Sequence, residues 1–156
     1  MRLGARGIAR PSTGIMPPRG VPSSRANDAR AVGPACGPQT PLTTAGLDAD
    51  VVEADLFSFA PAAPFEVVYE QTCLCALTPG RWTEYEQRLH GWLVPGGRLA
   101  VAFMQTDAAE GPPFACRPEA MRRLFAADRW EWPADLVPEP HPLGLAELTG
   151  ILRRRG

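Results

Sequence analysis

The sequence contains no lysine and carries no excess of positive charge. Its 16 basic residues are all arginine, 17 acidic residues oppose them, and the formal net charge is -1. Such a chain has no overall positive field that would attract nucleic acid. It also lacks an apolar run near the ~18 residues of a membrane-spanning helix, and it lacks the apolar core of a secretory signal. We therefore expect a soluble, cytoplasmic protein that binds neither nucleic acid nor a membrane.

Aromatic residues are missing from the first 47 positions, although the chain has four Trp, two Tyr and six Phe. That segment is rich in arginine, proline and glycine, and Asp28 is its single acidic residue. Such a composition buries too little apolar surface to offset the entropy of ordering the chain. We predict that residues 1–47 are a disordered or mis-started N-terminal segment and that residues 48–156 form the folded domain.

Two other interpretations of this arginine-rich segment are an organelle transit peptide and a basic arm for nucleic acid. A transit peptide needs an amphipathic helix, which Pro11, Pro17, Pro18 and Pro22 would interrupt. A nucleic-acid arm would gain from aromatic side chains that stack on bases, and the segment has none. The disordered or misplaced segment remains the favoured interpretation.

Cysteine is sparse, and the four cysteines do not suggest a disulfide framework. Cys73, Cys75, Cys116 and His141 are residue types that ligate metals, but a Cys-x-Cys pair at the start of a buried helix more often fills apolar space. We expect no metal site, and we expect free thiols in a reducing compartment.

From residue 41 onward, apolar runs and helical periodicity alternate. Trp82, Tyr85, Leu89 and Trp92 recur at intervals of three and four, which predicts a helix with one apolar face after Thr78 as its N-cap. Together the segments predict an open α/β sheet. The expected strands are 51–54, 65–70, 98–104, 128–132 and 145–153; the expected helices are 79–94 and 118–127, with 42–47 as the end of an earlier helix.

Ligands of open α/β sheets bind beyond the carboxyl ends of the strands, so residues that directly follow strands are the site candidates. These positions are Asp55-Leu56, Glu70-Gln71-Thr72 and Gln105-Thr106. Asp55 would accept a hydrogen bond from an exocyclic amine while Leu56 lies against a flat ring. An alternative of equal weight is that Asp55 only caps its loop. Glu70 and Gln71 would meet the polar end of the same ligand.

Six segments carry a family resemblance: residues 51–59, 65–70, Cys75-Ala-Leu-Thr-Pro79, Trp92-Leu-Val-Pro-Gly-Gly97, 98–104 and Gly111-Pro-Pro-Phe114. They resemble class I S-adenosylmethionine-dependent methyltransferases, and more narrowly the thiopurine and thiol S-methyltransferase family. The Leu-x-Pro-Gly-Gly turn is a feature of the class, whereas the ordered set points to the family. The resemblance covers about residues 48–156, the C-terminal half to two thirds of a typical member.

The resemblance implies a Rossmann-like sheet, S-adenosyl-L-methionine as cofactor, and S-methylation of a small thiol or similar soft nucleophile. It implies that Asp55 and Leu56 flank the adenine, that Glu70 and Gln71 lie near the methionine end, and that the loop with Phe114 covers the acceptor. An ionised thiol needs little help from a general base, so we expect positioning to dominate and name no catalytic base.

One feature of the family is absent: the glycine-rich turn after the first strand, with an acid after the next strand to hold the ribose. The sheet thus lacks its first strands, which would expose the edge of a central strand. We expect a truncated or mis-started chain, and the alternative to an active methyltransferase is a non-catalytic remnant.

A nicotinamide-dependent enzyme is disfavoured because no Gly-x-Gly-x-x-Gly motif is present. The oligomeric state stays open.

Overall fold

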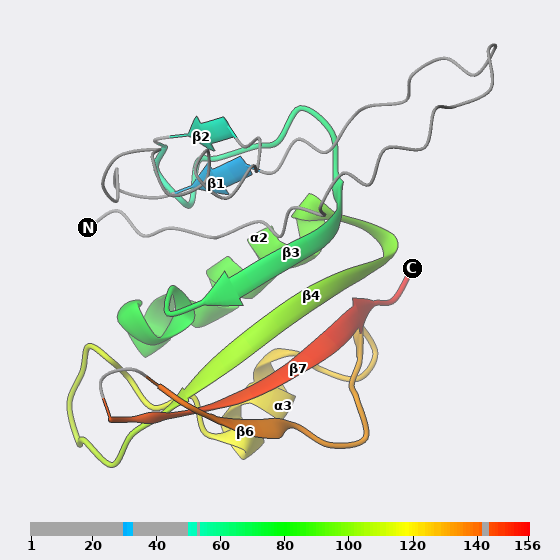
Figure 1. Cartoon of the computed structure of the whole chain (residues 1–156). Coiled ribbons are helices and arrows are strands. Elements are labelled where there is room, and N and C mark those ends of the chain that lie inside the picture. The colour runs from blue at the N-terminus through cyan, green and yellow to red at the C-terminus, as the bar shows by residue number, and fades with distance from the viewer. Residues whose placement is uncertain (1–29, 33–49, 53, 142–143) are drawn as a thin grey trace, which may run out of the picture.

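The computed structural model describes residues 30–32, 50–52, 54–141 and 144–156 (Figure 1). Most of the segment predicted to be disordered, and the helix end expected at 42–47, lie outside these residues. Arg30–Val32 is the exception, since it forms strand β1. The prediction for residues 1–47 as a whole therefore stays a prediction.

The main sheet has five strands, and its order is β3-β4-β7-β5 with β6 paired to β7. β3 runs parallel to β4, whereas β7 runs antiparallel to β4, β5 and β6. The open α/β sheet expected from the sequence is therefore confirmed. The strands are β3 (Phe65–Gln71), β4 (Leu93–Gln105), β5 (Trp130–Glu131), β6 (Val137–Pro140) and β7 (Ala146–Arg154).

Two helices, α2 (Trp82–Trp92) and α3 (Pro118–Leu124), lie behind the sheet in Figure 1. Two short 3-10 turns, η1 (Leu74–Ala76) and η2 (Pro79–Arg81), connect β3 to α2. The apolar face predicted for α2 is buried at Tyr85, Leu89 and Trp92. It packs in one core with sheet residues such as Val101 and Leu152.

The sheet presents different side chains on its two faces, as the alternation of a strand requires. Val68 and Glu70 of β3 are buried beside α2, whereas Tyr69 and Gln71 point to the other face and are half-buried. On that other face Ile151 of β7 is 52% exposed. Among the described residues, the helices thus cover one face of the sheet.

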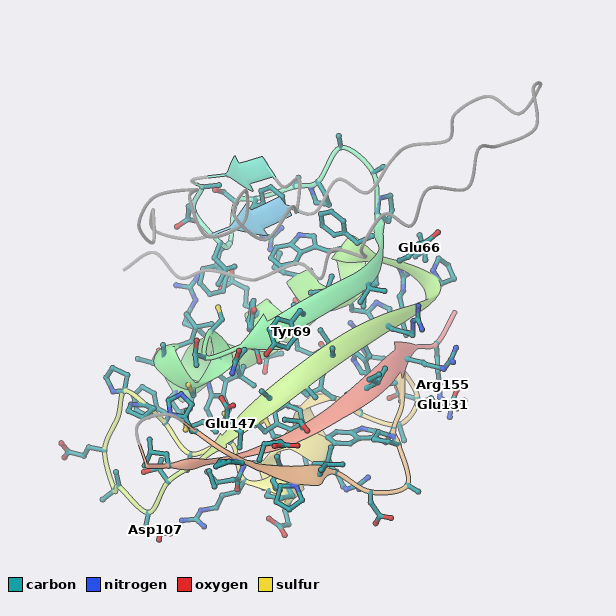
Figure 2. The ribbon with its side chains drawn as sticks, viewed as in Figure 1. Glu66, Tyr69, Asp107, Glu131, Glu147 and Arg155 are labelled. Atoms are coloured by element: carbon teal, nitrogen blue, oxygen red, sulfur yellow. The ribbon has the colours of Figure 1, made fainter. Side chains whose placement is uncertain are left out.

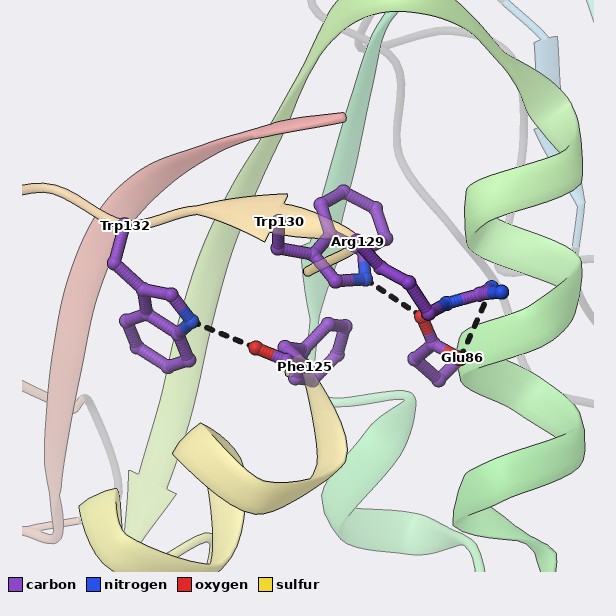
Figure 3. A network of polar contacts seen from close by, with 5 residues as sticks. All are labelled: Glu86, Phe125, Arg129, Trp130 and Trp132. Carbon is purple, nitrogen blue, oxygen red and sulfur yellow. Dashed lines mark hydrogen bonds and ion pairs between the residues drawn. The ribbon is translucent and has the colours of Figure 1, made fainter. Parts of the chain in front are cut away.

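The connection between α2 and β5 is polar although it is buried (Figure 3). Glu86 of α2 is 4% exposed and accepts hydrogen bonds from Trp130 Nε1 at 2.6 Å and from Arg129 Nε at 3.1 Å. Trp132 Nε1 donates to the Phe125 carbonyl at 2.7 Å. These contacts hold α2, the end of α3 and β5 together, with Trp130 buried in the core and Trp132 half-buried against it.

Most predicted elements are present with shifted ends. The helix expected over 79–94 begins as η2, ends at Trp92, and receives no side-chain hydrogen bond from Thr78. The helix expected over 118–127 ends at Leu124, and the strand expected over 128–132 is reduced to Trp130–Glu131. The turn at Gly96, which has a φ of 75°, lies within β4 instead of ending the helix.

One strand prediction was wrong, and one strand was not predicted. Residues 51–54 were expected in the main sheet, but β2 (Asp50–Val52) pairs in parallel with β1 in a separate two-stranded sheet. A short apolar run does not specify its partner strand, which explains the error. β6 was missed because Pro138 and Pro140 interrupt it; proline is tolerated there because β6 lies at the margin of the sheet.

Candidate cofactor-binding site

The candidate site is built around the turn that follows β3. Thr72 there has a φ of 63°, a left-handed conformation that is unfavourable for a β-branched residue. Its Oγ1 donates a hydrogen bond to the Gln71 carbonyl at 2.6 Å. Backbone strain is concentrated at functional sites, and ligands of such sheets bind at the ends of parallel strands, so this turn is a candidate binding site.

Glu70 anchors the turn from inside the core. The side chain is 1% exposed, and its Oε1 accepts the backbone N–H of Leu74 at 2.7 Å. Burial raises the pKa of this carboxyl group to about 7, although the backbone donors of Leu74 and Cys73 oppose the rise. Its Oε2 has no hydrogen-bond partner among the described residues. Glu70 therefore holds η1 in place, and its role toward a cofactor stays a proposal.

Gln71 lies on the opposite face of β3 and belongs to a chain of polar contacts. Tyr69 Oη donates to Gln71 Oε1 at 2.6 Å, and Gln71 Nε2 donates to Glu147 Oε2 at 3.1 Å. Glu147 comes from β7, two strands away, and is 4% exposed. Figure 2 shows Tyr69 and Glu147 on the side of the sheet turned away from the helices. The amide of Gln71 is thus held in one orientation.

The loop that carries Phe114 is attached to the ends of β3 and β4. The Phe114 N–H donates to the Cys75 carbonyl at 2.6 Å, and the Cys116 N–H donates to the Met104 carbonyl at 2.8 Å. Gln105 Nε2, which the sequence singled out, donates to the Cys116 carbonyl at 3.0 Å. Glycine at position 111 lets the Phe114 ring approach the backbone, because a Cβ atom there would lie 2.6 Å from the ring. The structure thus places Phe114 beside the turn that carries Glu70 and Gln71.

Asp55 and Leu56 lie on a different turn. Asp55 Oδ1 accepts the backbone N–H groups of Phe57 and Ser58, both at 3.0 Å, so Asp55 does cap its own loop. Leu56 is buried in the core. Arg81 at the start of α2 stacks on the Phe57 ring at 3.7 Å. Among the described residues, no hydrogen bond joins this turn to Gln71 or Phe114, and the adenine role of the pair stays a proposal.

The three described cysteines are buried free thiols close to Glu70. Burial raises the pKa of Cys73 to about 12 and that of Cys75 to about 11, and it also raises the pKa of Cys116. Thiols of this kind are neutral near pH 7 and are poor nucleophiles. Within the described part of the chain, no group of three or more His, Cys, Asp or Glu residues could hold a metal ion.

Sequence reasoning missed two members of the site, Tyr69 and Glu147. Both lie in segments that were expected to be strands, where they were treated as ordinary strand residues. A signal did exist for Glu147, because it is an acidic residue near the start of an otherwise largely apolar strand. Only the pairing of β7 with β4 brings it near Gln71, and that pairing is not visible in the sequence.

Comparison with known proteins decides the family. Residues 39–136, more than half of the chain, match the family described as thiopurine S-methyltransferase (TPMT). The chain belongs to the thiopurine S-methyltransferase family. The match spans the turn of Asp55, the turn of Glu70 and Gln71, and the loop of Phe114. The resemblance stated from the sequence is therefore confirmed.

Known relatives of this family member are similar to it in sequence over part of their length only. Thiopurine S-methyltransferase of Vibrio vulnificus (strain YJ016) is 33% identical over 95 residues, which are 59% of this chain and 43% of that protein. A probable thiol methyltransferase 2 of Arabidopsis thaliana is 34% identical over 59 residues, 38% of this chain and 26% of that protein. The chain therefore matches less than half of the length of these relatives.

Solved structures establish the fold of this family member. A Burkholderia thailandensis 1,6-didemethyltoxoflavin-N1-methyltransferase superposes with a TM-score of 0.61 at 22% identity, over 81% of this chain and 61% of that one. The N-methyltransferase NodS from Bradyrhizobium japonicum WM9 gives 0.57 at 14% identity, over 73% and 65%. The sheet and helices thus have the fold of class I S-adenosylmethionine-dependent methyltransferases.

No helix in the described part of the chain has the length and apolarity to span a membrane.

Proposed function

We propose that this chain acts as an S-adenosylmethionine-dependent methyltransferase that methylates the sulfur of a small thiol or similar soft nucleophile. The observation that carries the proposal is the family match over 39–136, which contains all five predicted site residues. Glu70, Gln71 and Phe114 lie at the carboxyl end of β3, where ligands of such sheets bind. The Vibrio vulnificus relative carries the name thiopurine S-methyltransferase, which supports a thiol acceptor.

The residues at this end of the sheet suit the cofactor. S-adenosylmethionine carries a cationic sulfonium and an amino group, and the described site offers carboxyl oxygens of Glu70 and Glu147 that lack a partner. Gln71 and Glu70 would hold its methionine end, while Asp55 and Leu56 would flank the adenine. When bound, the cofactor supplies an electrophilic methyl group on sulfur.

The chain itself contributes orientation and exclusion of water. The loop of Phe114, attached at the Cys75 and Met104 carbonyls, would cover the acceptor. A thiol that ionises in solution needs no general base in the protein, so alignment of the two reactants supplies the rate. The buried cysteines are unsuited to act as intermediate methyl carriers because their raised pKa values keep them protonated. Free thiols also fit our proposal of a cytoplasmic location.

A second candidate function is that of a non-catalytic remnant that binds no cofactor by itself. The observation that favours it is the outer edge of β3, which pairs with no strand among the described residues. A ligand at a parallel sheet normally touches strands on both sides of the site. The family resemblance is the same under both candidates, so cofactor binding is the property that separates them.

A thermal melt of the full chain with and without millimolar S-adenosylhomocysteine tests the proposal. A ligand that binds only the folded state adds about 2.7 kcal/mol of stability at 100 times its Kd, so the melting temperature should rise by several degrees. A cooperative melt without a shift would support the remnant. A shift should be followed by a methyl-transfer assay with small thiols.

Three variants then test the placement of the cofactor. Asp55→Ala and Gln71→Ala should each weaken S-adenosylhomocysteine binding about tenfold, because each removes a hydrogen-bonding group from the proposed site. His90→Ala is the control, since His90 packs against Trp130 near the other end of α2. The affinities are measured by calorimetry. Equal losses in all three variants would contradict the proposed site.

A further inference from the structure

Glu147 presents a buried oxygen atom that the fold does not use. Its Oε2 accepts from Gln71 Nε2 at 3.1 Å, whereas its Oε1 has no hydrogen-bond partner among the described residues. The residue is 4% exposed. A buried polar atom without a partner costs free energy, and functional sites are where such costs are found.

The surrounding contacts determine what kind of group would satisfy this oxygen. Tyr69 Oη donates to Gln71 Oε1, so the amide is oriented with its NH₂ group toward Glu147. β3, the strand of Gln71, also carries Glu70, whose Oε2 is buried and lacks a described partner, but this side chain lies on the face of the sheet that the helices cover. A carboxylate only accepts hydrogen bonds, so Oε1 of Glu147 needs a donor.

No positively charged side chain supplies that donor within the described residues. The ion pairs found there are Arg81 with Glu84, Arg117 with Asp107, and Arg129 with Glu86, and none involves Glu147 or Glu70. On its face of the sheet, Glu147 is therefore a buried carboxyl group with no described cation beside it. A ligand that brings a positively charged N–H donor gains both a hydrogen bond and charge neutralisation there.

We propose that Glu147 is a recognition residue whose Oε1 accepts a hydrogen bond from the cationic amino group of a small-molecule ligand. The inference rests on the proposed function, because it places that ligand at the cofactor and acceptor site. Two ligands would bring such a group: the cofactor, through the amino group of its methionine part, or an acceptor that is an aminothiol. The recognised chemistry is the same, and the experiment separates the sources.

The test compares Glu147→Gln with Glu139→Gln in the full chain. The first substitution keeps the shape of the side chain and removes its negative charge. The second is a matched control, since Glu139 lies opposite Glu147 on β6 but is exposed. A thermal melt of each variant checks that the fold is retained.

Calorimetry then measures binding of two ligand pairs. S-adenosylhomocysteine is compared with its analogue that lacks the amino group, and cysteamine with mercaptoacetate, a thiol of similar size and opposite charge. The wild-type chain should bind the amino member of one pair more tightly. Glu147→Gln should weaken that amino ligand about tenfold or more and leave its partner unchanged, while Glu139→Gln changes neither.

The pair that loses affinity identifies the source of the amino group. Equal affinities within both pairs, equal losses in the two variants, or no binding of any amino ligand would each overturn the proposal. Methyl transfer to 2-mercaptoethanol, which carries no charge, tests the proposed function separately. If 2-mercaptoethanol is methylated but Glu147→Gln binds the amino ligands as the wild type does, the proposed function stands and the inference is wrong. If Glu147→Gln weakens cysteamine binding but no methyl group is transferred, the inference stands and the proposed function is wrong.

Discussion

Glu70 and Gln71 are adjacent in the chain but have opposite surroundings. Glu70 faces the core and holds the N–H of Leu74, whereas Gln71 faces the uncovered side and contacts Tyr69 and Glu147. A strand turns successive side chains to opposite faces, so two neighbours cannot make the same contact with one ligand. Under the proposed function, Gln71 would therefore meet the methionine end of the cofactor from one face of β3 and Glu70 from the other.

The raised pKa of Glu70 predicts how stability depends on pH. The pKa is about 7 in the folded chain, against 4.5 for an exposed carboxyl group, so the folded state retains its proton over that interval while the unfolded state has lost it. The free energy of unfolding should therefore fall as the pH rises from about 4.5 to 7, by at most about 3 kcal/mol.

Glu70→Gln should remove most of this dependence, because an amide does not titrate. Urea denaturation at pH 5 and pH 8 measures it for the wild type, Glu70→Gln and Glu66→Gln. Glu66 lies on the same strand but is exposed, so its variant should keep the wild-type dependence. If the Glu70 variant keeps it as well, the burial of this carboxyl group does not control stability.

At the scale of the element, the attachment of α2 to β5 depends on one buried acidic residue near the middle of the helix. Glu86 accepts from both Trp130 and Arg129 and so connects α2 to β5, which is two residues long. Two residues cannot hold a strand in place through backbone pairing alone. The side-chain contacts shown in Figure 3 therefore contribute a large share of the attachment of β5 to the helix layer.

Glu86→Ala should destabilise the protein by about 3 kcal/mol, because it leaves the Trp130 N–H buried without an acceptor. Glu84→Ala on the same helix is the control. Glu84 pairs with Arg81 on the surface, and loss of such a pair costs less than about 1 kcal/mol. Both costs can be read from urea unfolding curves. Similar costs for the two variants would mean that the buried network adds little.

On the scale of the whole molecule, the described structure is a two-layer arrangement with helices on one side of the sheet (Figure 1). The chain matches 43% of the length of its Vibrio vulnificus relative. β3, whose carboxyl end carries the candidate site, is at the edge of the sheet that the described residues form. Cofactor binding by the full chain is therefore the property to measure first.

The layer arrangement predicts opposite results for two neighbours on β7. Leu152 is fully buried against the helices, whereas Ile151 is 52% exposed on the other face. Leu152→Ala should cost about 2–5 kcal/mol, because it leaves a cavity in the core. Ile151→Ala should cost less than about 1 kcal/mol. The comparison uses thermal or urea unfolding, and equal costs would show that the second face is also covered.

Much of the fold was predictable because it depends on patterns between near neighbours. The run from Phe65 to Glu70 predicted β3, and the spacing from Trp82 to Trp92 predicted α2 and its buried face. The family resemblance likewise rested on short segments such as Cys75-Ala-Leu-Thr-Pro79. The ends of elements were less predictable, since Leu93 leaves the helix for β4 under the influence of strand pairing that spacing does not record.

Patterns within short stretches of the sequence predicted the class of fold and the family, both of which are confirmed, and they marked the turns after the strands as candidates for ligand binding. Tertiary structure alone decided that Glu147 lies against Gln71, 76 residues away in the chain, and that Val51 and Val52 pair with β1 outside the main sheet. The physical reason is that pairing between strands depends on which edges meet in space. A local pattern specifies the conformation of a strand, but it does not specify its neighbour.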